Sequence, residues 1–153
     1  MENKHKKIER YSGIAAIIIN SKTKKILLIK RRNLPIIQNK GIWSFLFGGK
    51  KKNETYLETA YREIKEETKL EEHDLKIFSK PKKMLIFDDK RKERWYNYLY
   101  LFLTNTERIK LSFENSSFRW ADPEDIFTEN NYKNIFFERK AIELLIKNAL
   151  DCL

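Results

Sequence analysis

Three glutamates near the middle of the chain have the residue type and the spacing to bind a divalent cation. Glu63, Glu66 and Glu67 are three and four residues apart, so in a helix their side chains lie together and spread over about 100° of its circumference. Like charges at this spacing destabilise a helix by about 0.2–0.5 kcal/mol per pair, and a bound cation relieves the repulsion. Carboxylates favour Mg²⁺, Mn²⁺ or Ca²⁺, and Mg²⁺ keeps waters and substrate phosphates among its ligands.

The residues around these glutamates predict the helix that would position them. Apolar side chains recur at the i, i+3, i+4, i+7 spacing of a helix that packs on a core, at Leu57, Ala60, Tyr61 and Ile64. This stripe fixes the rotation of the helix and places the glutamates on a neighbouring face. A solvated acidic surface is the alternative interpretation of the same spacing.

The loop before the predicted helix favours a ligand site. Gly48 and Gly49 are two of the chain's four glycines, and three lysines follow them directly. Glycine lets the backbone approach a ligand closely, and the lysines attract phosphate, with a solvated loop as their alternative interpretation.

Residues 48–70 resemble the Nudix box, whose signature is G-x5-E-x7-R-E-(aliphatic)-x-E-E-x-G-(aliphatic). Eight of the nine specified positions match, at Gly48, Glu54, Arg62, Glu63, Ile64, Glu66, Glu67 and Leu70. The ninth, a glycine in the family, is Lys69. The resemblance implies an α/β protein with the Nudix fold, in which a mixed β-sheet is sandwiched between α-helices. It also implies a metal-dependent hydrolase that cleaves pyrophosphate bonds.

The resemblance implies roles for the residues of the box. Glu63, Glu66 and Glu67 would hold Mg²⁺, for which Mn²⁺ can substitute, and would form the catalytic group together with Arg62. Water activated by the cation would attack phosphorus, and Glu63 is our hypothesis for the general base. Arg62 is expected to hold the acidic face in register by pairing with an earlier glutamate, either Glu54 or Glu58.

Further ligands are implied outside the helix. Glu114 would complete the metal shell, with Glu107 as its competitor. A backbone carbonyl in the turn before the box would join them, from either Gly48 or Phe47. Substrate phosphates would be bound by Arg31, Arg32 and Lys50, although either arginine could equally face solvent.

The chain departs from the family pattern at two places. The family commonly has W-x-x-P-G-G before the box, whereas this chain has WSFLFGG. Either Gly48 is the box glycine, or the Gly-Gly pair aligns directly and one residue is deleted after Lys50. At the second place, the family glycine ends the helix in the left-handed conformation, so Lys69 should weaken the cap by about 1 kcal/mol and leave the chemistry intact.

The remaining pattern predicts a mixed fold. Residues 13–19 and 25–29 read as a hairpin, and residues 76–79, 83–87 and 95–104 read as strands, the last two joined by a charged loop at 88–94. One face of the last strand carries Tyr96, Tyr98, Tyr100 and Phe102, which favour the core over stacking on a nucleobase. A final helix over 134–150 should bury Ile135, Ala141, Leu144, Leu145 and Ala149.

Length and composition fit a single small enzyme. The 153 residues suffice for one domain, expected over 11–153 behind a basic N-terminal arm at 1–10. The net charge of +10 favours polyanionic partners. The single cysteine, Cys152, cannot form an intrachain disulfide, and the longest aliphatic run is too short to span a bilayer. We therefore expect a cytoplasmic protein without a membrane partner, whose oligomeric state the sequence leaves open.

The expected reaction is hydrolysis of a nucleoside diphosphate linked to another moiety. Residues 85–88 lack the proline or tyrosine that marks the family's ADP-ribose and dinucleoside-polyphosphate enzymes at this distance from the box. This favours a small-molecule nucleotide, a nucleoside triphosphate or a relative of one, as the substrate. The alternative is a non-catalytic nucleotide- or RNA-binding module, against which the complete set of box carboxylates argues; RNA is not favoured as a partner.

Overall fold

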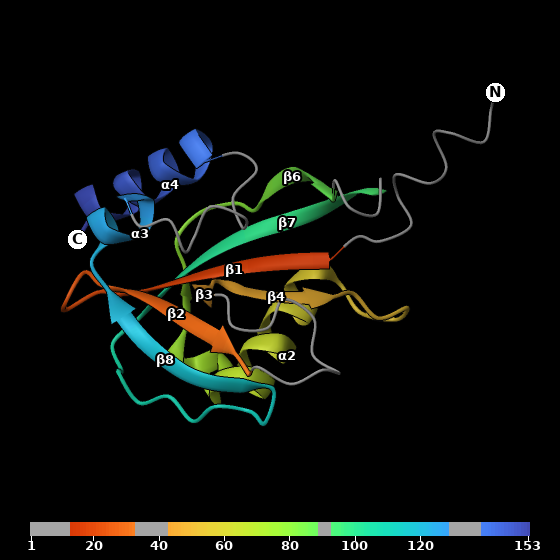
Figure 1. Cartoon of the computed structure of the whole chain (residues 1–153), viewed down its shortest axis with the longest axis horizontal. Coiled ribbons are helices and arrows are strands. Elements are labelled where there is room, and N and C mark those ends of the chain that lie inside the picture. The colour runs from red at the N-terminus through yellow and green to blue at the C-terminus, as the bar shows by residue number, and fades with distance from the viewer. Residues whose placement is uncertain (1–12, 33–42, 89–92, 129–138) are drawn as a thin grey trace.

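A single mixed sheet forms the centre of the molecule (Figure 1). The computed structural model describes residues 13–32, 43–88, 93–128 and 139–153. Within these ranges the sheet contains eight strands. They are β1 (Gly13–Asn20), β2 (Ile26–Arg31), β3 (Trp43–Ser44), β4 (Leu46–Gly49), β5 (Lys76–Ile77), β6 (Lys82–Asp88), β7 (Glu93–Thr104) and β8 (Asn115–Ala121). The helices are α2 (Tyr56–Thr68), α3 (Pro123–Thr128) and α4 (Arg139–Asp151), with a short 3-10 turn η1 (Glu72–Asp74).

Strand β1 is the central element of the sheet because its whole length is buried. Its aliphatic residues suit a strand that is covered on both faces. It runs parallel to β7 over all eight residues, while its other edge pairs antiparallel with β4 at the start and with β2 at the end. The predicted hairpin of the first two strands is confirmed. Strands β4 and β2 therefore lie at opposite ends of the same edge of β1. The loop that leads into α2 follows β4.

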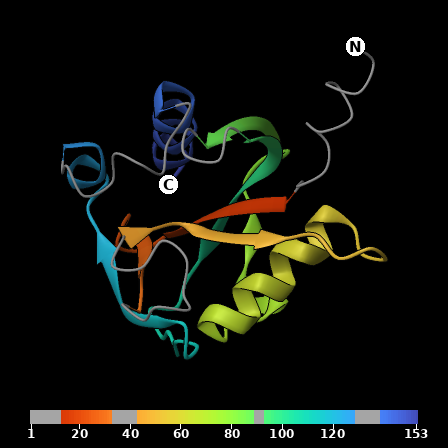
Figure 2. The same cartoon turned by 45° about the vertical axis from the view of Figure 1, so that its right-hand side comes forward.

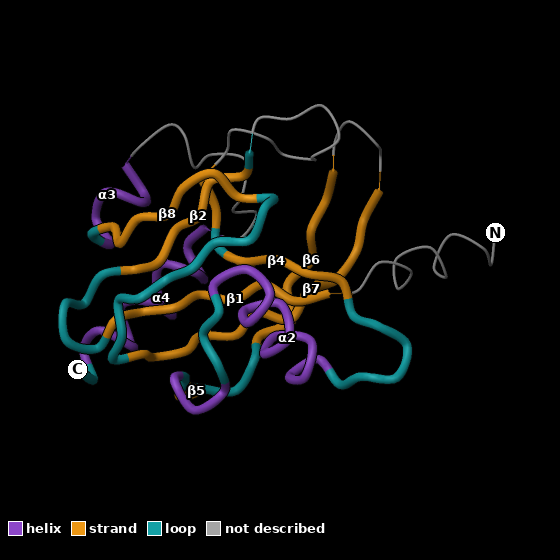
Figure 3. Tube along the Cα trace, turned by 90° about the horizontal axis from the view of Figure 1, so that it is seen from below, coloured by secondary structure: helices purple, strands orange, loops and turns teal. Residues whose placement is uncertain are grey.

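The sheet separates two hydrophobic layers, which confirms the predicted sandwich (Figure 2). Alternate residues of β1 point to opposite faces. Ala15, Ile17 and Ile19 pack in the cluster that includes α4, whereas Ile14 and Ile18 pack in the cluster that includes α2. Figure 3 views the molecule from the side on which α2 crosses β1 and β4. The α2 layer therefore carries the box residues on a rigid support.

The aromatic face of β7 belongs mainly to the core beneath α2. Tyr100 and Phe102 are buried in the α2 cluster, and Tyr98 packs against the Tyr56 ring at a centroid distance of 4.3 Å. The prediction that core packing outweighs base stacking is confirmed for Tyr100 and Phe102, since neither ring is accessible to a ligand.

Two details of the predicted elements are wrong. The loop predicted at 88–94 is too long, because Asp88 and Glu93 already pair with each other in the β6–β7 ladder. In α4 the buried residues are Ile142, Leu145, Ile146 and Ala149, while Leu144 is exposed. Leu145 and Ala149 are thus buried as predicted and Ala141 is half-buried, whereas burying Ile142 and Ile146 leaves Leu144 on the opposite side. Ile135 and the arm at 1–10 lie outside the described residues.

Local signals define both ends of α2. At its start, Thr55 and Glu58 form a reciprocal capping box: Glu58 N donates to Thr55 Oγ1 at 3.1 Å, and Thr55 N donates to Glu58 Oε1 at 3.2 Å. At its end, Lys69 adopts the left-handed conformation with φ 63° and ψ 10°, as predicted. The loop before β8 then returns to this end, where Lys110 N donates to the Thr68 carbonyl at 3.0 Å.

In the part of the chain that the structure describes, no helix is long and apolar enough to cross a membrane.

Replacing the left-handed lysine with the family glycine should stabilise the protein. We expect Lys69→Gly to raise the free energy of unfolding by about 0.5–1 kcal/mol, because glycine adopts this conformation without steric cost. Lys65→Gly, inside α2, is the matched control and should lower it by about 1 kcal/mol. Urea denaturation of both variants checks this; a Lys69→Gly variant as destabilised as the control would contradict it.

Candidate functional site

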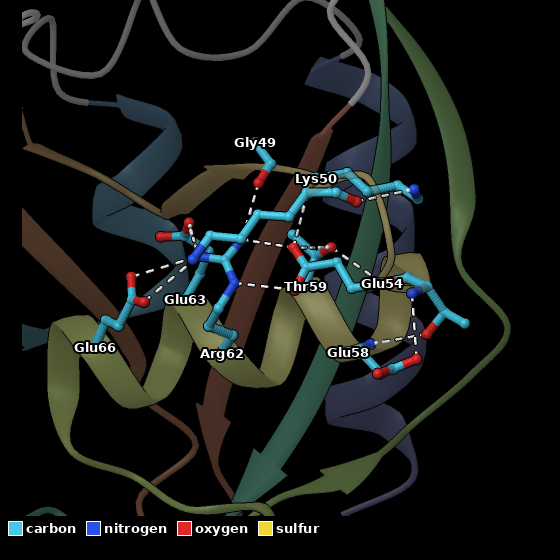
Figure 4. Close-up of polar contacts among 10 residues, drawn as sticks. Gly49, Lys50, Glu54, Glu58, Thr59, Arg62, Glu63 and Glu66 are labelled. Carbon is cyan, nitrogen blue, oxygen red and sulfur yellow. Dashed lines mark hydrogen bonds and ion pairs between the residues drawn. The ribbon is translucent and has the colours of Figure 1, made fainter.

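Arg62 and Glu54 form the structural anchor of the site (Figure 4). The Arg62 guanidinium donates to both carboxylate oxygens of Glu54, with Nη2 to Oε1 at 2.6 Å and Nε to Oε2 at 3.0 Å. Lys51 N and Thr59 Oγ1 also donate to Glu54 Oε1, at 2.8 and 2.9 Å. These bonds, with the Arg62 bond foremost, lower the pKa of Glu54 to about 2. Of the two predicted partners of Arg62, the structure selects Glu54, since Glu58 caps the helix.

The same guanidinium reaches the loop and the acidic face. Arg62 Nη2 donates to the Gly49 carbonyl at 2.9 Å, and Nη1 lies 2.8 Å from Glu63 Oε1 and 3.5 Å from the Glu66 carboxylate. The bond to Glu54 is the main reason that the pKa of Arg62 is raised, so the group stays charged. Arg62 therefore holds strand β4, the loop and helix α2 together.

Gly48 provides the space that Glu63 occupies. A Cβ atom on Gly48 would lie 2.1 Å from Glu63 Cγ, so no larger residue fits without moving the glutamate. The closely packed Glu63 carboxyl has a raised pKa, because burial outweighs the opposing effect of Arg62. This glutamate is therefore held between β4 and α2, and its orientation is set by both.

Glu67 is a buried carboxylate with an unsatisfied oxygen. Only 6% of the residue is exposed, and its Oε2 atom has no hydrogen-bond partner among the described residues. Burial, followed by repulsion from Glu63, raises the pKa of Glu67 to about 8, while Arg31 opposes the shift. A buried charge without a partner is costly. A divalent cation fits this environment, since it would satisfy the oxygen and neutralise the neighbouring charges.

Glu114 reaches the same place from a distant part of the chain. Strand β8 pairs with β2, which brings residue 114 next to the end of β2. Arg31 Nη2 contacts Glu114 Oε2 at 3.3 Å. The charge of Glu114 contributes to the raised pKa values of both Glu63 and Glu67, so it lies close to them. Its competitor Glu107 uses its backbone carbonyl to accept from Trp120 Nε1 at 3.3 Å.

The basic residues predicted to bind substrate divide into two groups. Arg31 lies among the carboxylates, and Arg32 is bonded to the backbone of the loop before β8. Lys50 instead folds back, with its ammonium 3.1 Å from the Lys51 carbonyl and 5.7 Å from the centre of the Tyr56 ring. Arg31 thus stands at the acidic site, Arg32 is bonded to the loop that precedes Glu114, and Lys50 is engaged in its own loop.

The acidic side chains do not yet converge as a metal shell. Within the described residues, no three His, Cys, Asp or Glu side chains meet closely enough to hold a metal ion as they stand. The contacts explain this, because Glu63 and Glu66 are engaged with Arg62. Sequence reasoning gave Glu54 as one of two partners of Arg62 but missed why Gly48 must be small, for which the box spacing was the only signal.

Comparison with known proteins agrees with this site. The family model described as NUDIX domain matches residues 9–145. An RNA pyrophosphohydrolase of Pelagibacter ubique is 30% identical over 128 residues, which cover 75% of this chain and 78% of that protein. An RNA pyrophosphohydrolase of Legionella pneumophila is 29% identical over 116 residues, covering 64% of this chain and 63% of that protein.

Solved structures of low sequence identity share the fold. The MutT protein from Methanosarcina mazei superposes with a TM-score of 0.70 at 21% identity, covering 90% of this chain and 96% of that one. An Ap4A hydrolase of C. elegans gives a TM-score of 0.65 at 19% identity, covering 93% and 96%. The chain therefore belongs to the NUDIX domain family, as its box predicts, and is an enzyme of the pyrophosphohydrolase class.

Proposed function

We propose that the chain uses Mg²⁺ to hydrolyse a pyrophosphate bond in the 5′-polyphosphate of a nucleotide. The observation that carries this proposal is the buried, unpartnered oxygen of Glu67 among other carboxylates. Glu63, Glu66, Glu67 and Glu114 would hold the cation. When bound, Mg²⁺ would neutralise phosphate charge and make water nucleophilic at neutral pH. Mn²⁺, which also favours carboxylate ligands, would substitute for it.

The chain's own residues have distinct parts in this proposal. Glu63 is the candidate to accept a proton from the attacking water, because burial raises the pKa of its carboxyl. Arg62 acts as a positioning residue that releases Glu63 and Glu66 when a cation competes for their oxygens. Arg31 and Arg32 would bind substrate phosphates, since guanidinium groups match phosphate geometry. Lys50 would join them only by leaving its present contacts.

The backbone ligand is better assigned to Phe47 than to Gly48. The Gly48 carbonyl oxygen lies against Gly13 of β1, only 2.3 Å from where a Cβ on Gly13 would be. Carbonyls alternate in direction along a strand. The Gly49 carbonyl points the other way, to Arg62, so that of Phe47 shares its direction. We therefore propose Phe47 as the carbonyl donor at the acidic face.

Two substrates of the same chemistry fit the site. The sequence favours a small nucleoside triphosphate, whereas the curated relatives are RNA pyrophosphohydrolases, which supports the 5′-polyphosphate end of RNA. The net charge of +10 suits either polyanion. The proposed location is the cytoplasm, where both substrates occur.

A substrate panel tests the proposal. The purified protein is incubated with nucleoside triphosphates, a 5′-triphosphorylated oligoribonucleotide, Ap4A and ADP-ribose, each with Mg²⁺, Mn²⁺ or EDTA, and products are identified by mass. We expect metal-dependent cleavage of a 5′-triphosphate. Binding without turnover in every metal would instead support the non-catalytic module, and a steep loss of affinity with salt would point to many phosphate contacts.

Removing one carboxylate at a time tests the metal site. Glu66→Gln should lower kcat by about a hundredfold or more, since cation stabilisation of the transition state amounts to several kcal/mol. The fold should persist because the Glu66 side chain is 54% exposed and touches Arg62 only at 3.5 Å. Glu72→Gln, an exposed acid beyond the helix, is the charge control. Near-normal turnover by Glu66→Gln, with unchanged Mn²⁺ affinity, would exclude this glutamate as a ligand.

Burial of Glu67 predicts a pH-dependent loss of stability without metal. The unfolded carboxyl ionises near its ordinary pKa of 4.5, but the folded one ionises only near pH 8. Ionisation therefore favours the unfolded state increasingly between pH 4.5 and 8. In EDTA, Glu67→Gln should raise the free energy of unfolding at pH 8 by about 1–3 kcal/mol and change it little at pH 4.5.

Denaturant titrations at both pH values measure this difference, with Glu66→Gln as the exposed control. Saturating Mg²⁺ should stabilise the wild-type protein and offset the gain in stability that Glu67→Gln shows in EDTA at pH 8. An equal effect of Glu67→Gln at both pH values would show that the charge of Glu67 is not the cause.

A further inference from the structure

An exposed aromatic ring stands directly beside the acidic site. Phe113 exposes 69% of its surface, the largest fraction among the large hydrophobic side chains that the structure describes. It immediately precedes Glu114, so the two Cα atoms are about 3.8 Å apart. Solitary exposed hydrophobic residues are common on proteins. Exposure alone therefore assigns no role to this ring, and any role depends on its contacts with neighbouring residues.

The ring is held in place by the end of β2. The guanidinium carbon of Arg32 lies 5.3 Å from the centre of the Phe113 ring, and Arg32 Nε donates to the Phe113 carbonyl at 2.8 Å. The backbone is fixed too, since Arg32 N donates to the Glu114 carbonyl at 2.7 Å. One face of the ring thus rests on a cation, while the high exposure leaves the other face open to a ligand.

Glu114 connects the ring to the groups proposed to bind the cation and the phosphates. Glu114 pairs with Arg31 and acts electrostatically on Glu63 and Glu67. Carboxylates, two arginines and an aromatic ring are thus linked through Glu114 and its neighbours. These are the groups that the phosphates and the planar base of one nucleotide would need.

We propose that the open face of Phe113 stacks on the nucleobase of the substrate, with Arg32 supporting the ring from behind. The inference rests on the proposed function, because it assumes that the carboxylates and arginines hold the polyphosphate of the same nucleotide. Every base has a π-face, so stacking makes Phe113 a binding residue that tolerates different bases. It supplies affinity for nucleotides over inorganic polyphosphates.

Binding measurements that do not depend on turnover test this assignment. Calorimetry with Mg²⁺ compares three ligands: α,β-methylene ATP, a 5′-triphosphorylated oligoribonucleotide and inorganic tripolyphosphate, which has no base. Phe113→Ala should weaken binding of the base-containing ligands by about tenfold, the lower part of the range for one stacked base, and leave tripolyphosphate binding unchanged. Phe113→Trp should bind nucleotide as well as the wild type does.

Leu144→Ala is the matched control, since Leu144 is another hydrophobic residue, 54% exposed, on α4 across the sheet. It should change none of the three affinities. A Phe113→Ala variant with wild-type affinity for both base-containing ligands overturns the proposal. So does an equal loss for tripolyphosphate, which would show that the ring only supports the loop, and so does a wild-type protein that binds no nucleotide.

The outcome is separable from that of the proposed function. Nucleotide binding that depends on Phe113, without hydrolysis anywhere in the substrate panel, supports the stacking site and contradicts the enzymatic proposal. Turnover and ligand affinities that are both unchanged by Phe113→Ala support the enzymatic proposal and contradict the stacking site. A loss confined to the oligoribonucleotide identifies the stacked base as one from RNA, whereas a loss for both nucleotides places it on the triphosphate-bearing nucleoside.

Discussion

The ion pair between Arg62 and Glu54 is the interaction on which the site depends. It connects Glu54, in the loop between β4 and α2, to the middle of α2. The same guanidinium binds the Gly49 carbonyl and Glu63. An arginine serves here because one planar group presents several donors in fixed directions, which an ammonium cannot do. The glutamates of α2 would repel one another without this cation in their midst. Arg62 therefore makes a carboxylate-rich helix face compatible with the folded state.

Glu67 shows the opposite arrangement, a buried carboxyl that the fold compensates only in part, through Arg31. The α2 layer could have buried an apolar residue at this position, which would have stabilised the core. It buries a carboxyl whose pKa is raised to about 8 and whose Oε2 atom has no partner in the described part of the chain. Arg62 serves Glu63 and Glu66 but not Glu67. The two halves of the acidic face thus differ: one is neutralised by the protein, and the other favours an external cation.

The sequence predicted well the parts of the site that lie within one helix. It predicted less well the parts that depend on pairing between distant strands. The i, i+3, i+4 spacing was sufficient to place the box glutamates and to rotate α2, and the helix end at Lys69 followed from a local conformational preference. The position of Glu114 depends on β8 pairing with β2, across more than eighty residues, so only the family resemblance indicated it. The face of α4 was predicted wrongly at Leu144, because periodicity alone could not choose between two adjacent apolar stripes. The exposure of Phe113 has no sequence signal, since an isolated phenylalanine ordinarily indicates core.

The two adjacent glycines of the loop are not equivalent, and their difference favours one alignment of the box. Gly48 has no room for a Cβ because Glu63 fills that space, whereas a Cβ on Gly49 would meet nothing within 4 Å. The position that sterically requires glycine is therefore the one that lies six residues before Glu54, as the box signature demands. No deletion after Lys50 is needed. The preceding family glycine is then replaced by Phe47, whose side chain packs into the α4 cluster on the far side of the sheet. A bulky residue is tolerated there because strand β4 directs the Phe47 side chain away from α2.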